Sequence, residues 1–198
     1  MPSGGRSDPS ESELVARYAA RTDEGYRLPG IPFRKIDPKY YRQRVENLTG
    51  EPEGVVVGDV RSRFLYLTEG AGMAMRYGIG IGRAGFTWAG EGVIQWRQKW
   101  PRWTPPPEMI ARQPELRKYC YGNGGQAPGP DNPLGSRALY IFQNGMDTLY
   151  RPHGTKDWRS IGNAVSSGRV RLLNQDVMDL YERVPAKARI VVLRRESE

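Results

Sequence analysis

His153, the single histidine of this 198-residue chain, precedes a short turn of small residues that ends at Arg169. The turn consists of Ser166, Ser167 and Gly168, and its backbone N–H groups could point together at an anion. We expect this turn to lie just before a helix, whose N-terminus also favours anions. A histidine base, a donor-rich turn and a nucleophile together would form an acyl-transfer site.

The residue at the nucleophile's place does not fit that chemistry. Arg169 keeps its proton at any working pH and has no lone pair for attack. Ser166 and Ser167 carry hydroxyl groups that His153 could activate, as in serine hydrolases. Alternatively, both serines only satisfy the turn and cap the segment after it. The residues by themselves leave both interpretations open.

The elements that must position these residues are mainly short β-type runs. Strands are predicted over GVVVGDV (54–60), RFLYLTE (63–69), MAMRYGIGIG (73–82), EGVIQWRQKW (91–100) and ARIVVL (188–193). Asn144 and Gly145 predict a type I′ hairpin within 136–155, which delivers His153 to the end of a strand. Glycine-rich residues 122–135 hold five glycines and three prolines and predict an irregular loop, either a lid or a tolerated insertion.

Helices are predicted at three places. Ser10 is the expected N-cap of a helix in ESELVARYAAR, and a short helix is expected from Glu108 to Arg112. Asn174 is the expected N-cap of a helix in NQDVMDLYERV, with apolar residues at helical spacing: Val177, Leu180, Tyr181 and Val184. The fold class is therefore mixed α+β, mostly β with short helices. Residues 1–53 are expected to form an irregular N-terminal arm with one short helix, and residues 54–198 a single domain.

Composition restricts the partners. The net charge of +8 arises from 30 basic and 22 acidic residues, and the bases are mostly arginine, which favours planar anions such as nucleic acid, carboxylate-rich peptides or anionic cell-wall polymers. The basic residues form no single run, which disfavours a nucleic-acid module. Cys120 is the only cysteine, so neither an intrachain disulfide nor a thiolate metal cluster can form. No apolar run reaches the roughly 20 residues of a membrane span. The start, MPSGGRSDPSESE, has no signal-peptide core.

Several separated motifs carry a resemblance to a known family. HGT, WRSIG and AVSSGRVRLLNQDVMDLYERVP, followed by a final strand, resemble the L,D-transpeptidase family with its YkuD-type domain, and so do the upstream segments RFLYL, MRYGIGIGRAGFTWAG, WPRWTPPPEMI and GPDNPLGSRALYIFQNG. The likeness covers about residues 54–193. It implies a β-sandwich or open-barrel fold.

The resemblance also implies roles for individual residues. His153 matches the general base of the family and the carbonyl of Gly154 the group that orients it. Ser166, Ser167 and Gly168 match the family's Ser-His-Gly, and Arg169 falls on the catalytic cysteine.

Two further residues match the family's substrate-binding positions. Arg171 matches the polar residue after the nucleophile, and Trp158 matches the aromatic side chain beside the donor-peptide groove. Cys120 matches no nucleophile of the family pattern.

The family resemblance implies an envelope enzyme that needs no metal or organic cofactor. Its cysteine attacks a tetrapeptide stem of peptidoglycan and forms a thioester, which an amine of another stem or of an envelope lipoprotein resolves; carbapenems acylate the same cysteine. A periplasmic or envelope location would require an export signal outside this numbering. With Arg169 in place of cysteine, we expect little or no transpeptidase activity. The alternative is a non-catalytic peptidoglycan-binding pseudoenzyme in which Arg169 pairs with carboxylates.

Overall fold

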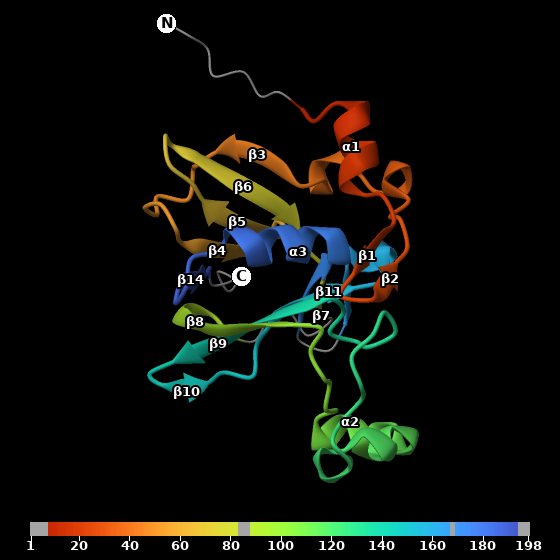
Figure 1. The fold of residues 1–198 in the computed structure, drawn as a ribbon. Coiled ribbons are helices and arrows are strands. Elements are labelled where there is room, and N and C mark those ends of the chain that lie inside the picture. Colours follow the sequence, from red (N-terminus) through yellow and green to blue (C-terminus); the bar gives the residue numbers. More distant parts are fainter. Residues whose placement is uncertain (1–7, 83–87, 167–168, 194–198) are drawn as a thin grey trace, which may run out of the picture.

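The computed structural model describes residues 8–82, 88–166 and 169–193, and in them one large twisted sheet dominates (Figure 1). Its strand order is β13-β11-β9-β8-β14-β4-β5-β6-β3, and β10 pairs with β9 at the side. The bounds of these strands are β3 (Gln43–Glu46), β4 (Val56–Asp59), β5 (Phe64–Thr68), β6 (Met73–Gly78), β8 (Gly90–Lys99), β9 (Arg137–Gln143), β10 (Met146–Asp147), β11 (Pro152–Thr155), β13 (Val170–Leu173) and β14 (Arg189–Val192).

Smaller elements surround this sheet. Two strand pairs lie outside it: β1 (Arg21–Asp23) with β2 (Tyr26–Leu28), and β7 (Ile81–Gly82) with β12 (Ala164–Ser166). The α-helices are α1 (Glu11–Arg17), α2 (Pro107–Arg112) and α3 (Asn174–Arg183). The 3-10 helices are η1 (Phe33–Lys35), η2 (Pro38–Tyr40), η3 (Pro114–Tyr119), η4 (Tyr121–Asn123) and η5 (Trp158–Ser160). The predicted fold class, mostly β with short helices, is confirmed.

The hairpin predicted at Asn144 and Gly145 is present. Their φ angles are 51° and 76°, the positive values that a type I′ turn requires. Leu149, with φ of 65°, separates the returning chain into β10 and β11. His153 therefore lies within β11, where it pairs with Ala138 of β9 and with Arg171 of β13.

The predicted entry into α3 is wrong in two respects. Strand β13 lies between the turn and the helix, so the turn does not directly precede the helix N-terminus. Leu173, not Asn174, is the N-cap, and no side chain caps the helix. The buried side chain of Asn174 instead links the start of α3 to β11 and to the residue before β9. Its Oδ1 accepts from the N–H of Ser136 at 2.9 Å, and its Nδ2 donates to the carbonyl of Thr155 at 3.2 Å. The predicted Val177 and Leu180 are buried in the helix, and the predicted Val184 is buried directly after it, as the C-cap.

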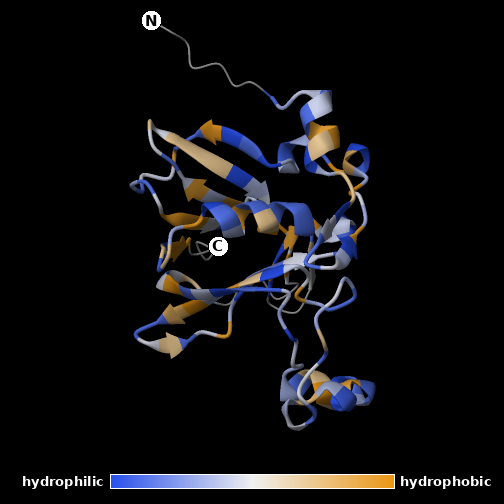
Figure 2. Cartoon of the chain, in the orientation of Figure 1, coloured by the Kyte–Doolittle hydropathy of each residue, from blue (hydrophilic) through white to orange (hydrophobic). Residues whose placement is uncertain are grey.

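Helix α3 lies between the strands β3–β6 and the strands β8 and β9 (Figure 1). Much of α3 is hydrophilic, whereas hydrophobic residues run along the strands on either side of it (Figure 2). The main core joins the apolar face of the helix to the sheet, and its most buried members include Val56, Tyr77, Ile79, Leu139, Ile141, Leu172, Val177 and Leu180. Burial of these side chains, about 1.5–3 kcal/mol each, holds the helix on the sheet.

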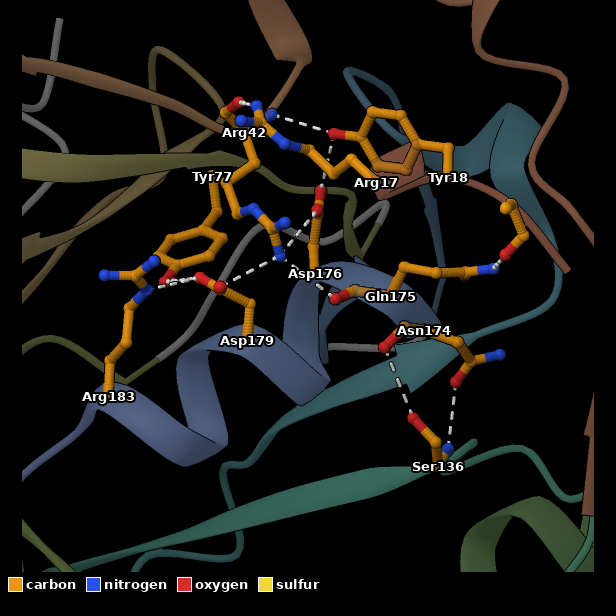
Figure 3. Close-up of polar contacts among 11 residues, drawn as sticks. Arg17, Tyr18, Arg42, Tyr77, Ser136, Asn174, Gln175, Asp176, Asp179 and Arg183 are labelled. Atoms are coloured by element: carbon orange, nitrogen blue, oxygen red, sulfur yellow. Dashed lines mark hydrogen bonds and ion pairs between the residues drawn. The ribbon is translucent and has the colours of Figure 1, made fainter. Parts of the chain in front are cut away.

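The polar side chains of α3 are joined in a buried network that reaches the N-terminal segment (Figure 3). The hydroxyl of Tyr18 donates to Oδ2 of the fully buried Asp176 at 3.3 Å. Arg42 lies 3.8 Å from Oδ1 of Asp176 and 3.2 Å from Oδ1 of Asp179. Tyr77 of β6 donates to Asp179 at 2.8 Å. The network therefore ties residues far apart in the sequence to one helix.

The N-terminal segment is packed on the sheet. Its helix α1 has the predicted cap at Ser10, whose Oγ accepts from the N–H of Glu13 while Glu13 accepts from the N–H of Ser10. Strand β3 of the same segment pairs with β6 in the main sheet. A separate apolar cluster fixes the segment, made of Leu14, Tyr18, Ile31, Phe33, Ile36, Tyr41, Ile161 and Leu173.

A lobe that contains α2, η3 and η4 projects from the sheet (Figure 1). The short helix predicted at Glu108–Arg112 is present there as α2. Residues 122–135 form no strand or α-helix, and the buried Asn132 organises them by donating to the carbonyls of Pro101 at 3.1 Å and Ala127 at 3.0 Å. No helix in the described ranges is long and apolar enough to cross a membrane.

Candidate functional site

His153, the predicted general base, is oriented by the backbone of the residue that follows it. Its side chain is almost fully buried, and Nδ1 lies 2.7 Å from the carbonyl oxygen of Gly154. Because a carbonyl can only accept, Nδ1 carries the proton and Nε2 carries the lone pair. Within the described ranges, Nε2 has no hydrogen-bond partner. The predicted pairing of His153 with the Gly154 carbonyl is present in this geometry.

The electrostatics of the site weaken that base. Burial, together with the positive charges of Arg169, Arg171 and Arg151, lowers the pKa of His153 to about 3, although the hydrogen bond to Gly154 opposes the shift. A general base works best with a pKa near the operating pH, so His153 is neutral but a weak proton acceptor here.

Arg169 lies immediately before β13 and is half-buried. The guanidinium carbon lies 5.7 Å from the ring centroid of Trp103, in a cation–π arrangement. Burial, with the charges of Arg151 and Arg171, lowers the pKa of Arg169 to about 10, so the group remains protonated at pH 7. The side chain at the predicted nucleophile position is therefore a cation in a cationic surrounding.

The structure gives part of the predicted turn. Ser166 ends strand β12, where its backbone pairs with Gly82 of β7. The predicted oxyanion residues Ser167 and Gly168 lie outside the described residues, and their geometry stays a prediction.

The two predicted substrate-binding side chains, Arg171 and Trp158, lie on either side of Asp157. Arg171 lies beside His153 on β13, and its Nη1 forms an ion pair with Asp157 at 3.8 Å. Trp158 follows Asp157 in η5, half-buried, with the guanidinium carbon of Arg159 4.4 Å above its ring. The structure thus brings Arg169, Arg171 and His153 together, with Trp158 one turn beyond β11.

Asn174 and Gly135 pack closely against Gly154, the residue that orients His153. Neither was predicted from the sequence to contribute to the site. A Cβ atom on Gly154 or on Gly135 would overlap Oδ1 of Asn174. Gly154 also donates its N–H to the carbonyl of Leu134 at 3.1 Å. The glycine after His153 is therefore required by close packing, and the only sequence signal for it is its residue type.

A nucleophile at Cys120 and a metal site are two other kinds of chemistry that the sequence raised. Cys120 is half-buried between η3 and η4 in the projecting lobe, which is a different element from those that carry the site. In the part of the chain that the structure describes, no group of three or more His, Cys, Asp and Glu side chains could hold a metal ion.

Known proteins resemble this chain over most of its length. The probable L,D-transpeptidase YbiS of Escherichia coli is 36% identical over 143 residues, which are 70% of this chain and 44% of YbiS. The chain thus spans about half the length of the curated relatives it matches.

Two solved structures are also similar. A Brucella melitensis protein named probable carnitine operon oxidoreductase caia is 44% identical, with a TM-score of 0.55 over 82% of this chain and 99% of its own. An Enterococcus faecium L,D-transpeptidase matches with a TM-score of 0.50 at 13% identity over 72% of this chain and 50% of its own, which supports the fold alone.

The family comparison covers the main sheet apart from β3, together with His153 and Arg169. It matches residues 53–192, from the segment before β4 to the end of β14. The chain belongs to the L,D-transpeptidase catalytic domain family, YkuD.

Proposed function

We propose that this chain is a cell-envelope protein of the L,D-transpeptidase family that takes part in peptidoglycan cross-linking or remodelling, and that Arg169 impairs its cysteine-type acyl transfer. One observation supports the proposal: the positive charge of Arg169, at the position that the family resemblance assigns to the nucleophile, lies close enough to His153 to lower the pKa of that histidine. A thioester cannot form on a guanidinium, because that group has no lone pair to attack a carbonyl. Loss of a nucleophile removes most of an enzyme's rate enhancement, on the order of several powers of ten.

The proposed impairment extends to the base. The same cation that replaces the thiol also lowers the pKa of His153. An arginine at position 169 therefore removes the nucleophile and also weakens the predicted base. A cysteine at this position would restore the thiol and remove the positive charge near His153. A thiolate would favour protonated histidine, as in other Cys–His pairs.

The test is reversion of Arg169. The Arg169→Cys variant and the parent are each incubated with a carbapenem, and the intact proteins are weighed. We expect a covalent adduct on the variant alone. Arg169→Ala is the matched control for lost charge without a gained thiol, and a Cys120→Ala change in the revertant background excludes labelling of Cys120.

Two outcomes would contradict this account. An adduct on the parent would mean that Cys120 or a serine acts as nucleophile. An unlabelled revertant that binds carbapenem no better than the parent would mean that the groove itself no longer fits the family's ligands.

A second candidate function is a binding protein without catalysis. It is favoured by the three arginines around His153, namely Arg151, Arg169 and Arg171. Guanidinium groups bind carboxylates in a bidentate manner, so Arg169 could pair with a carboxylate of the diamino acid or of D-alanine in a stem peptide. Muropeptide affinity measured with and without Arg169→Ala tests this role, and unchanged affinity would exclude it. Neither candidate involves nucleic acid, for which affinity would fall steeply with salt. An envelope lipoprotein stays the alternative acceptor for an active relative.

A further inference from the structure

We propose that the N-terminal segment of this chain forms one wall of a second binding subsite, which takes a free carboxylate of a peptide ligand. The inference rests on the proposed function, since the peptide would be the same stem. The wall consists of residues 35–40, which lie outside the span matched to the family. This wall of the subsite therefore lies in the N-terminal segment, which the family model does not cover.

The subsite is an open groove of about 390 Å³ between η1–η2 and η5. That volume lies within the range of about 300–1,000 Å³ found for ligand pockets. Its lining combines cations, aromatic rings and two buried isoleucines: Lys35, Ile36, Asp37, Lys39, Tyr40, Trp158, Arg159, Ile161, Gly162 and Asn163.

The charge of the groove selects an anion. Lys35, Lys39 and Arg159 face one carboxylate, that of Asp37. Asp37 is already engaged, because its Oδ1 accepts from the N–H of Lys39 at 3.1 Å and its Oδ2 lies 3.7 Å from the ammonium group of Lys39. In the part of the chain that the structure describes, neither Lys35 nor Arg159 forms an ion pair. Two cations on opposite walls are thus left to bind a ligand.

The shape of the lining favours a peptide carboxylate. The planar guanidinium of Arg159 lies over the ring of Trp158 at 4.4 Å, which presents its edge for bidentate pairing. The Trp158 ring and the isoleucines offer apolar surface to the methyl and methylene groups of short side chains. A peptide with a free carboxylate carries both kinds of group.

The groove is preformed because its two walls touch at Tyr40. A Cβ atom on Gly162 would overlap the ring of Tyr40, and one on Gly78 would overlap its backbone. The Tyr40 ring also packs on Phe64, with centroids 5.5 Å apart. Two glycines therefore let the N-terminal segment approach closely, and little ordering cost remains for a ligand.

The groove also adjoins the candidate site. η5 follows β11, which carries His153, and Asn163 directly precedes β12, which leads towards Arg169. The carbonyl of Asn163 accepts from the N–H of Ile81 at 3.0 Å, which fixes this connection. Asp157, which directly precedes η5, forms an ion pair with Arg171 beside His153, so we expect a stem peptide at the candidate site to reach the groove along η5.

Binding of a synthetic tetrapeptide stem tests the subsite by calorimetry. The carboxylate-terminated stem and its carboxamide analogue are titrated into the parent and into Lys35→Gln, Arg159→Gln and Lys118→Gln. Lys118 lies on η3 in the projecting lobe and is the matched control. Each groove variant should bind the carboxylate stem roughly tenfold more weakly, the effect of losing one charge-assisted hydrogen bond. The carboxamide affinity and the Lys118→Gln protein should be unchanged.

The subsite would be overturned if the parent and both groove variants bound the carboxylate stem with equal affinity. It would also be overturned if the groove variants lost as much affinity for the carboxamide stem as for the carboxylate stem. Failure of the parent to bind either peptide would overturn it as well. The thermal midpoint of each variant confirms folding, since both side chains are exposed. Because the readout is affinity, these results are distinct from carbapenem labelling of Arg169→Cys, which tests the proposed function.

Discussion

The guanidinium carbon of Arg169 lies 5.7 Å from the ring centroid of the buried Trp103, which belongs to the segment leading into the projecting lobe. This contact joins the predicted nucleophile position to residues 122–135, because Trp103 pairs through its backbone with Gln126. A cation–π contact contributes about 0.5–2 kcal/mol. Burial and the charges of Arg151 and Arg171 oppose it, since they lower the pKa of Arg169. Arg169 therefore lies where its charge is disfavoured.

The first prediction concerns stability. Arg169→Gln should raise the free energy of unfolding by about 1 kcal/mol, because the lowered pKa of Arg169 shows that its surroundings disfavour the charge that the variant removes. Urea unfolding at pH 7 measures the change. Arg171→Gln is the control: burial also lowers the pKa of Arg171, but the charge of Asp157 opposes that shift, so the gain should be smaller. A variant less stable than the parent would show that the cation–π contact dominates.

The second prediction uses the single histidine as a probe. Burial and Arg169 hold the pKa of His153 at about 3, so Arg169→Gln should raise that pKa while burial keeps it below the ordinary 6.5. The folded pKa lies below the unfolded value, so the unfolded chain binds the extra proton between about pH 3 and 6.5 and stability falls as pH falls through that window. A pH titration of the one imidazole signal by NMR measures the shift. An identical pKa in parent and variant would refute the electrostatic coupling.

Much of the fold could be predicted from residue patterns. The alternation in 63–69 and 91–100 and the Asn144–Gly145 pair give local signals, and β5, β8 and the hairpin follow them. Strand β13 has only four residues, too few to show a period, and its pairing with β11 is a long-range contact that the sequence does not reveal. For that reason β13 was not predicted from the sequence, and the turn was wrongly expected to lie directly before α3.

The site was predictable by residue type but not by environment. His153, Gly154 and Arg169 stand out in the sequence, yet the weakness of the base depends on Arg151 and Arg171, which only tertiary packing brings near. Asn174 was predicted as a cap because it precedes an apolar helical pattern. Its side chain instead binds Ser136 and Thr155, a long-range choice that no local pattern reveals.

The third prediction concerns the support behind His153. Gly154→Ala should destabilise the chain by about 1–3 kcal/mol, because the added Cβ overlaps Oδ1 of Asn174 in a close-packed region. Asn174→Ala should cost a comparable amount, since it leaves the buried N–H of Ser136 without its acceptor. Thermal unfolding measures both. If the Gly154→Ala and Asn174→Ala effects simply add in the double variant, the overlap is not the cause, because removal of Asn174 should relieve it.

The fourth prediction concerns the buried network on α3. Burial raises the pKa of Asp176 to about 7, although Arg42 and the Tyr18 hydroxyl oppose that rise (Figure 3). Between about pH 4 and 7 the folded chain holds a proton on Asp176 that the unfolded chain has lost, so the contribution of this group to the free energy of unfolding falls as pH rises through that window.

Asp176→Asn stays neutral and keeps an oxygen for the Tyr18 hydroxyl. Relative to the parent, this variant should therefore gain about 2 kcal/mol between pH 5 and pH 8. Urea unfolding at the two pH values measures the gain. Asp179→Asn is the control, because it removes ion pairs with Arg42 and Arg183 and should lose stability at both pH values. An Asp176→Asn difference that is the same at pH 5 and pH 8 would mean that Asp176 stays ionised in the folded chain and that Arg42 at 3.8 Å offsets its burial.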